Sequence, residues 1–136
     1  MRRLASLLAC VASAAGFLSQ SSLAQSKPQA SAQVMTAGEL RLLMMSSSFT
    51  ACDLAANKTP WELSVASPSR IVTQIITDIY GGRPPGAAQV IQPEALFRVI
   101  STDIAINTLS LCPKFVPSES KAQLQKVIDA RKSSPK

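Results

Sequence analysis

The chain has 136 residues, a net charge of +6 and no histidine. Without an imidazole side chain, the Ser/His and Cys/His catalytic pairs and His-rich metal sites are excluded. The sequence also lacks a phosphate-binding loop, a dinucleotide fingerprint and a calcium loop. We therefore expect a protein that is not an enzyme and that holds no metal and no cofactor.

The first 24 residues have the pattern of a cleavable secretory signal. A cationic start, Met1-Arg2-Arg3, precedes an uncharged run over residues 4–18, and the small residues Ser22 and Ala24 stand at the −3 and −1 positions of a cleavage site. The run is shorter than the roughly 20 residues that a membrane-spanning helix needs. This favours cleavage after Ala24 over the alternative, an uncleaved anchor.

Lipidation is a second alternative for this segment. Leu7-Leu8-Ala9-Cys10 resembles a bacterial lipobox. Few apolar residues precede Cys10, however, and the apolar run continues past it, so the simple signal remains our prediction. After its removal, no later stretch is apolar for long enough to span a membrane.

The cysteines predict a covalent link. Cys10 is lost with the signal, which leaves Cys52 and Cys112 as an even pair in an oxidising compartment, where a disulfide is expected. A bond across this interval closes a long loop and stabilises the fold by roughly 4 kcal/mol. Two buried free thiols are the alternative. A catalytic thiolate is disfavoured, because no neighbouring group activates it.

The first predicted helix follows a polar leader over residues 25–35. Thr36 and Glu39 form a capping-box pattern, in which each side chain accepts from the other's backbone amide. Met35 and Leu40 stand at the hydrophobic-staple positions on either side of that cap. Apolar residues then recur at three- and four-residue spacing to about Ala55, which predicts a helix.

The next segment predicts a short turn and then a second helix. Thr59-Pro60-Trp61-Glu62 repeats the capping pattern, with Pro60 at the first helical position. Ser67-Pro68 then opens the second main helix, which ends at Gly81-Gly82. Isoleucines and valines make a strand the rival interpretation of residues 71–80, but their three- and four-residue spacing favours a helix.

Two further helices complete the predicted domain. One begins at Pro93 and ends before Pro113; because it is apolar on much of its circumference, we expect it to be central and the most buried. The other is amphipathic and covers residues 118–132, before a disordered tail at 133–136. The fold class is all-α: a small bundle of three to four helices in a single domain, 36–132, stapled by one disulfide.

The topology of such a bundle agrees with the predicted disulfide. In an up-down-up arrangement, the first and third helices end on the same side of the bundle. Cys52 is near the end of the first helix and Cys112 at the end of the third. The bond therefore joins neighbouring helix ends.

Positive charge is concentrated at the C-terminus. Residues 25–113 carry six basic and six acidic side chains, whereas residues 114–136 carry six basic and two acidic ones. The candidate binding residues there are Lys121, Lys126, Arg131 and Lys132, which predict a contact with an anionic membrane surface, an envelope polymer or an acidic protein. The alternative is a solvated helix end, where basic residues also suit the helix dipole. Nucleic acid is not expected, because aromatic residues are not interleaved with the basic ones.

Other candidate sites rest on single residues. Trp61, beside Pro60, is the best contact residue outside the core, with packing between helices as its alternative. Asp78 lies near the end of a helix, where a carboxylate is electrostatically unfavourable, and Asp103 lies within the most apolar helix. A carboxylate pair can do acid–base work. The alternative for both is that they face water or cap a neighbouring group.

Four short stretches carry a family resemblance: Cys52-x-Leu54, Pro60-Trp61-Glu62, Gly81-Gly82 and Leu111-Cys112. They resemble small exported cyanobacterial proteins of unknown function. The resemblance covers about residues 36–113 and implies a periplasmic or thylakoid-lumen location, and it carries over no catalytic residue. In size and paired cysteines the chain is also similar to acid-stress periplasmic chaperones, but no motif of theirs is matched.

Together these features predict an exported binding protein. We expect a periplasmic or secreted, non-enzymatic protein that contacts an envelope protein or an anionic surface through its basic C-terminal helix. The alternatives are a small hydrolase that uses carboxylates without histidine, and a chaperone-like or structural subunit.

Overall fold

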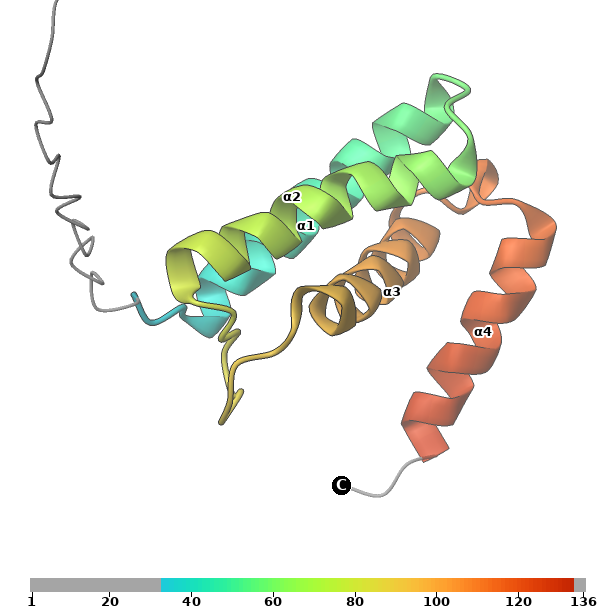
Figure 1. The fold of residues 1–136 in the computed structure, drawn as a ribbon. Helices are drawn as coiled ribbons and strands as arrows, with labels where there is room; N and C mark the ends of the chain where they lie inside the picture. The colour runs from blue at the N-terminus through green and yellow to red at the C-terminus, as the bar shows by residue number, and fades with distance from the viewer. Residues whose placement is uncertain (1–32, 134–136) are drawn as a thin grey trace, which may run out of the picture.

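The computed structural model describes residues 33–133, and the predictions for the signal, its cleavage and Cys10 lie outside them. The described chain forms four α-helices and one short 3₁₀ helix (Figure 1). In chain order they are α1 (Ala37–Ala56), α2 (Trp61–Tyr80), α3 (Pro93–Leu111), η1 (Pro113–Phe115) and α4 (Ser118–Ser133). The predicted all-α bundle is confirmed.

Helices α1, α2 and α3 form the body of the bundle. Each of the three packs against the other two, whereas α4 packs against α3 alone among the described helices. The chain runs along α1, returns along α2 and reverses again into α3 (Figure 1). This is the up-down-up order that the sequence predicts, and it places the ends of α1 and α3 on the same side.

The capping box at the start of α1 is formed as predicted. The Thr36 amide donates to Glu39 Oε2 at 2.7 Å, and the Glu39 amide donates to Thr36 Oγ1 at 3.2 Å. Met35 is only 3% exposed and belongs to the core, and Leu40 packs against the same cluster. Met35 is therefore part of the folded domain, although the sequence pattern assigns it to the leader.

The predicted break before Ser67-Pro68 is wrong. Helix α2 is continuous from Trp61 to Tyr80, and Pro68 lies inside it with a buried side chain. Residues 71–80 are therefore helical and not a strand. Proline removes one helical N–H and crowds the carbonyl four residues before it. In α2 the surrounding tertiary packing outweighs this local cost.

The capping pattern at the start of α2 also differs from the prediction. Pro60 is the N-cap residue and not the first helical residue, and no side-chain cap bond forms there. Instead, the Ser64 hydroxyl donates back to the carbonyl oxygens of Thr59 and Pro60, at 3.2 and 3.1 Å. Proline has no side-chain oxygen to accept from the first helix amides, so α2 starts without a capping box.

Two consecutive glycines end α2. Gly81 and Gly82 have φ of 60° and 72°, a left-handed conformation that L side chains rarely adopt. The Gly82 amide donates to Ile76 O at 2.9 Å, and its carbonyl accepts from the Ile91 amide at 2.9 Å. The second bond ties the α2–α3 loop back onto the end of α2, which sets where α3 begins.

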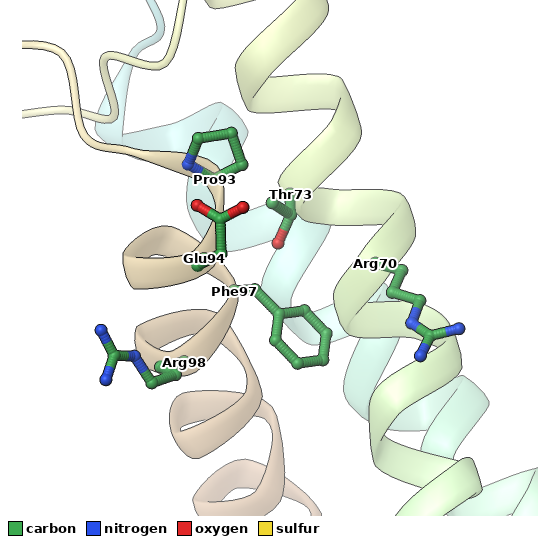
Figure 2. A pocket seen from close by; sticks show the side chains of 6 residues that line it. All are labelled: Arg70, Thr73, Pro93, Glu94, Phe97 and Arg98. Carbon is green, nitrogen blue, oxygen red and sulfur yellow. The ribbon is translucent and has the colours of Figure 1, made fainter.

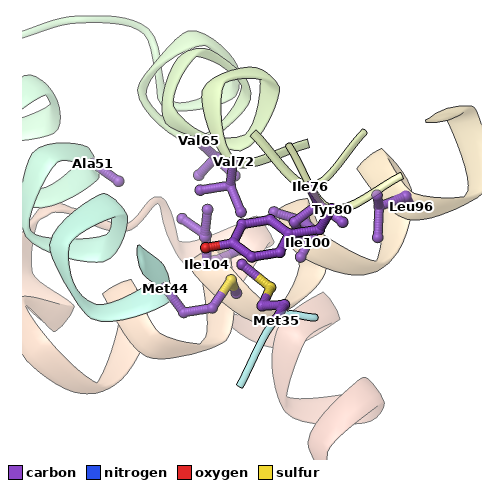
Figure 3. Packing of buried hydrophobic residues seen from close by; sticks show 11 residues of the cluster. Met35, Met44, Ala51, Val65, Val72, Ile76, Tyr80, Leu96, Ile100 and Ile104 are labelled. Atoms are coloured by element: carbon purple, nitrogen blue, oxygen red, sulfur yellow. The ribbon is translucent and has the colours of Figure 1, made fainter. Parts of the chain in front are cut away.

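The hydrophobic core lies between the three main helices (Figure 3). Its largest fully buried apolar side chains come from α2 and α3: Val72, Ile76, Leu96 and Ile104. Helix α2 has eight buried residues and α3 has five. The prediction that α3 is the most buried helix is therefore wrong, although α3 does contact each of the other three helices.

Small hydroxyl residues are buried beside the apolar core. The buried polar side chains are Ser47, Ser48, Ser64, Ser69, Thr73 and Thr108. Most of them donate to a carbonyl oxygen four residues earlier, as Ser69 does to Val65 O at 2.7 Å and Thr108 to Ile104 O at 2.7 Å. Because these bonds stay within one helix, the hydroxyls are satisfied in the core without partners on a neighbouring helix.

The predicted disulfide is present. Cys52 in the last turns of α1 is bonded to Cys112, the residue that follows α3, with a Cα–Cα distance of 6.0 Å. This separation is typical of native disulfides. The bond joins the two helix ends that the up-down-up order brings together.

Helix α4 is the least buried of the four α-helices. None of its residues is fully buried, although Leu124 packs against the core cluster. It extends to Ser133, one residue past the predicted end, and Val116 anchors the segment before it with 3% exposure. Among the described residues, no helix combines the length and the apolar character needed to cross a bilayer.

Candidate functional site

The basic residues of α4 do not form one compact patch. Lys121 is half-buried, whereas Lys126, Arg131 and Lys132 are exposed. Lys132 is three helical turns from Lys121 and nearly in line with it, but the five-residue step to Lys126 turns about 140° around the helix. The structure therefore brings Lys121 and Lys132 to one flank and places Lys126 on another.

Arg131 differs from the three lysines because it is paired within the fold. Its guanidinium donates to Asp103 on α3 at 2.6 Å, with the side chains 52% and 35% exposed. A pair this exposed contributes about 0–1 kcal/mol. The pair joins the C-terminal half of α4 to α3, so Arg131 is occupied and the lysines supply the unpaired charge.

The two candidate carboxylates are not brought together. Asp103 is engaged by Arg131, whereas Asp78 is exposed near the end of α2. Among the described residues, no hydrogen bond or ion pair joins them, and no group of three His, Cys, Asp or Glu side chains is placed to hold a metal ion. The described structure thus offers no observation that favours acid–base chemistry at these residues.

Trp61 lies where the helix-packing alternative places it. It is the first residue of α2, is half-buried, and packs against the hydrophobic cluster. Part of its ring is therefore already covered by the bundle. That Trp61 binds a partner stays a prediction, and it concerns only the exposed part of the ring.

A groove between α2 and α3 is a site that sequence analysis missed. It is wide open to solvent and has a volume of about 690 Å³, which is within the size range of small-molecule sites. The six residues that line it are Arg70, Thr73, Pro93, Glu94, Phe97 and Arg98. The Phe97 ring extends from α3 towards α2, and the two guanidinium groups lie at opposite edges (Figure 2).

The groove combines cationic edges with an apolar floor. Arg70 and Arg98 are exposed and make no ion pair within the described part of the chain. Thr73 is buried, and its hydroxyl already donates to Ser69 O at 2.8 Å. The Phe97 ring therefore occupies the middle of the groove, Pro93 lies at one end of it, and the free hydrogen-bond donors lie at the edges (Figure 2).

Charge counting conceals this groove. Arg70 and Arg98 belong to residues 25–113, where six basic and six acidic side chains cancel. The signal appears only once α2 and α3 are known to be adjacent, because these arginines are 28 positions apart in the chain. To identify them from the sequence, one would have to know which sides of α2 and α3 border the groove.

The C-terminal end of α2 makes a polar contact with the start of α1. The Tyr80 hydroxyl donates to Glu39 Oε1 at 3.4 Å and so joins the end of α2 to the capping box of α1. The hydrogen bond from the Thr36 backbone, followed by that from its side chain, lowers the pKa of Glu39. Desolvation, with the charge of Glu39, raises the pKa of Tyr80. The arrangement stabilises a helix junction and presents no reactive group.

The comparisons with known proteins identify a family but no activity. Comparison with curated proteins and with solved structures gave no match. The model of a domain of unknown function (DUF8650) matches residues 38–135, which include all four helices almost completely. The match covers well over half of the chain. The chain therefore belongs to the DUF8650 family.

Proposed function

We propose that this protein is an exported, non-enzymatic binding protein of the cell envelope that contacts an anionic surface through α4. The observation that carries the proposal is the set of lysines on α4, Lys121, Lys126 and Lys132, which make no ion pair within the described part of the chain. Lys126 and Lys132 are also exposed, so their charge is available to an external anion, whereas Lys121 is half-buried.

The position of α4 supports this function. One flank of the helix packs on α3 through Leu124 and the Arg131–Asp103 pair, and no residue is fully buried. Most of the helix surface therefore remains accessible. Export of the protein rests on the signal pattern in residues 1–24 and on the disulfide, which is typical of oxidising compartments.

The distribution of the lysines favours an extended partner over a small one. Because Lys126 is on a different flank from Lys121 and Lys132, the three charges cannot converge on one small anion. An anionic membrane surface or polymer presents charge over a wide area and can attract all three. Such attraction weakens as salt is added, because exposed charges are screened.

The test is vesicle binding by two charge-reversal variants. Sedimentation with vesicles that contain anionic lipid is measured for the protein, for Lys126→Glu/Lys132→Glu, and for Arg41→Glu/Arg83→Glu as a control with the same net-charge change. Arg41 and Arg83 are exposed and lie in α1 and the α2–α3 loop. We expect the α4 variant to lose at least tenfold in binding and the control to lose less than threefold.

Two results would contradict the proposal. Equal losses in both variants would mean that net charge, and not α4, determines binding. Binding that does not change between low and high salt would exclude an electrostatic contact. Circular dichroism of both variants verifies that the helical fold is retained.

A further inference from the structure

The groove between α2 and α3 has the chemistry of a binding site for an amphiphile. Its floor carries the half-buried Phe97 ring, and its two edges carry exposed guanidinium groups without ion-pair partners in the described chain (Figure 2). An apolar floor favours a hydrocarbon body, whereas an arginine binds a carboxylate through paired hydrogen bonds. A ligand that satisfies both parts has an apolar chain and an anionic head.

The two arginines are not equivalent. Arg98 follows Glu94 by four residues on α3, and residues at this spacing are neighbours on a helix surface. The carboxylate of Glu94 therefore offsets part of the field around Arg98. Arg70 has no acidic residue three or four positions away on α2. Its guanidinium therefore has no acidic neighbour on its own helix.

The placement of the charges also limits the head group. Because the guanidinium groups lie at opposite edges, they do not converge on a single point (Figure 2). Glu94 lines the same groove and would repel a head of high negative charge. Both features suit a head with one negative charge that meets one arginine, as a carboxylate does.

We infer that this groove binds a single-chain amphiphile with a carboxylate head, which pairs with Arg70 while its chain lies across Phe97 and Pro93 towards α3. The volume of about 690 Å³ is sufficient for a ligand of this class. The site is separate from the anionic contact of α4, since none of the residues that line it belongs to α4. Either contact can therefore fail without the other.

The experiment uses dodecanoate, below its micelle concentration, as the probe. Its affinity for the disulfide-bonded protein is measured by titration calorimetry, and the site is located by amide shifts in NMR spectra. Dodecyl maltoside supplies the same chain without charge, and acetate supplies the carboxylate without the chain. We expect saturable binding of dodecanoate with shifts around Thr73 and Phe97, and at least tenfold weaker binding of the other two probes.

Substitutions at the edges distinguish the two arginines. We expect Arg70→Gln to weaken dodecanoate binding at least tenfold, since it removes a charged hydrogen-bond donor. Arg98→Gln should weaken it less than threefold, and Glu94→Gln should strengthen it severalfold. Arg41→Gln, an exposed arginine on α1, is the matched control and should leave the affinity unchanged.

Substitution of the floor tests the apolar contact. Phe97→Ala should weaken binding at least fivefold. Phe97→Leu retains apolar volume and should weaken it less, and it serves as the second variant if the alanine variant is unstable. Lys126→Glu/Lys132→Glu should bind dodecanoate as the unmodified protein does, which separates this site from α4. Binding that is insensitive to Arg70→Gln, or amide shifts that avoid α2 and α3, would overturn the inference.

Discussion

Buried hydroxyl groups find their hydrogen-bond partners within their own helix. Serine and threonine in the core donate to carbonyls of their own helix, as Ser48 does to Met44 O at 2.7 Å. Such residues are small enough for close helix contacts, and they bury no unsatisfied donor when the bond is made. Ser101 on α3 is the exception among the described residues, because its buried Oγ has no hydrogen-bond partner.

This difference predicts opposite effects of the same substitution. Ser101→Ala should increase the free energy of unfolding by about 1 kcal/mol, since it removes a buried, unsatisfied hydroxyl. Ser48→Ala should decrease it by about 1 kcal/mol, since Ser48 is fully buried and its hydrogen bond is lost. Urea unfolding of both variants measures the two changes. A loss of stability in Ser101→Ala would show that its hydroxyl has a role that the structure does not reveal.

Glu39 predicts a dependence of stability on pH. Its pKa in the folded protein is lowered below 4.5, first by the hydrogen bond from the Thr36 backbone and then by that from the Thr36 side chain. The folded state therefore binds this proton less readily than the unfolded state. The contribution of Glu39 is present above pH 4.5 and is lost as the pH falls through the lower, folded pKa.

The measurement is the urea midpoint as a function of pH. Glu39→Gln should be less stable than the unmodified protein at neutral pH, and the difference should shrink as the pH falls below 4.5. Glu62→Gln removes an exposed carboxylate from the first turn of α2 and is the control. It should follow the pH dependence of the unmodified protein. A constant difference between Glu39→Gln and the unmodified protein across this range would contradict the prediction.

At the scale of the elements, local chemistry predicts helix ends better than helix interiors. The capping box at Thr36 and the glycines after Tyr80 mark true boundaries, because each supplies a bond or a backbone conformation that a helix end requires. Pro68 carries an equally strong local signal for a boundary, yet it lies inside α2. Packing of α2 against α1 and α3 keeps the helix continuous at Pro68, and the local sequence pattern carries no information about that packing.

Gly82 predicts which glycine of the α2–α3 loop is required. A Cβ at Gly82 would lie 3.0 Å from Val90 Cγ1 and 3.2 Å from Ile91 O, whereas a Cβ at Gly86 would meet nothing within 4 Å. Both residues have positive φ, 72° and 82°. Gly86→Ala should therefore cost only the backbone strain, about 1 kcal/mol.

Gly82→Ala adds the steric conflict and should cost about 2–3 kcal/mol. Thermal and urea unfolding of the two alanine variants measure the difference. The Ile91 amide donates to Gly82 O. A shift of the loop around the new methyl group would break this bond, so faster hydrogen exchange of the Ile91 amide is a second readout. Equal destabilisation by the two substitutions would show that the loop adapts around Gly82.

At the scale of the whole molecule, the fold was more predictable than the site. Helix spacing and the cysteine pair determine the all-α class, the up-down-up order and the Cys52–Cys112 bond together, since each constrains the others. The groove required the register between α2 and α3, which brings Arg70 close to Phe97. The same register is needed to see that Arg131 is paired with Asp103.

The disulfide predicts the largest single change in stability. It joins residues 60 positions apart. Removal of such a link raises the conformational entropy of the unfolded chain, which lowers the free energy of unfolding by about 4 kcal/mol. A small domain has a total stability of about 5–15 kcal/mol. Because Cys112 directly precedes η1, the bond also fixes where the chain leaves the bundle towards α4. Loss of the bond should therefore affect both the three-helix body and the position of α4.

Reduction and substitution should give the same result. In urea unfolding, dithiothreitol should lower the midpoint of the unmodified protein to that of Cys52→Ser/Cys112→Ser, and it should leave the midpoint of this variant unchanged. The comparison separates loss of the bond from general effects of the reductant. If the reduced protein and the double variant both unfolded at the midpoint of the oxidised protein, packing of α1 on α3 alone would be holding the two helix ends together.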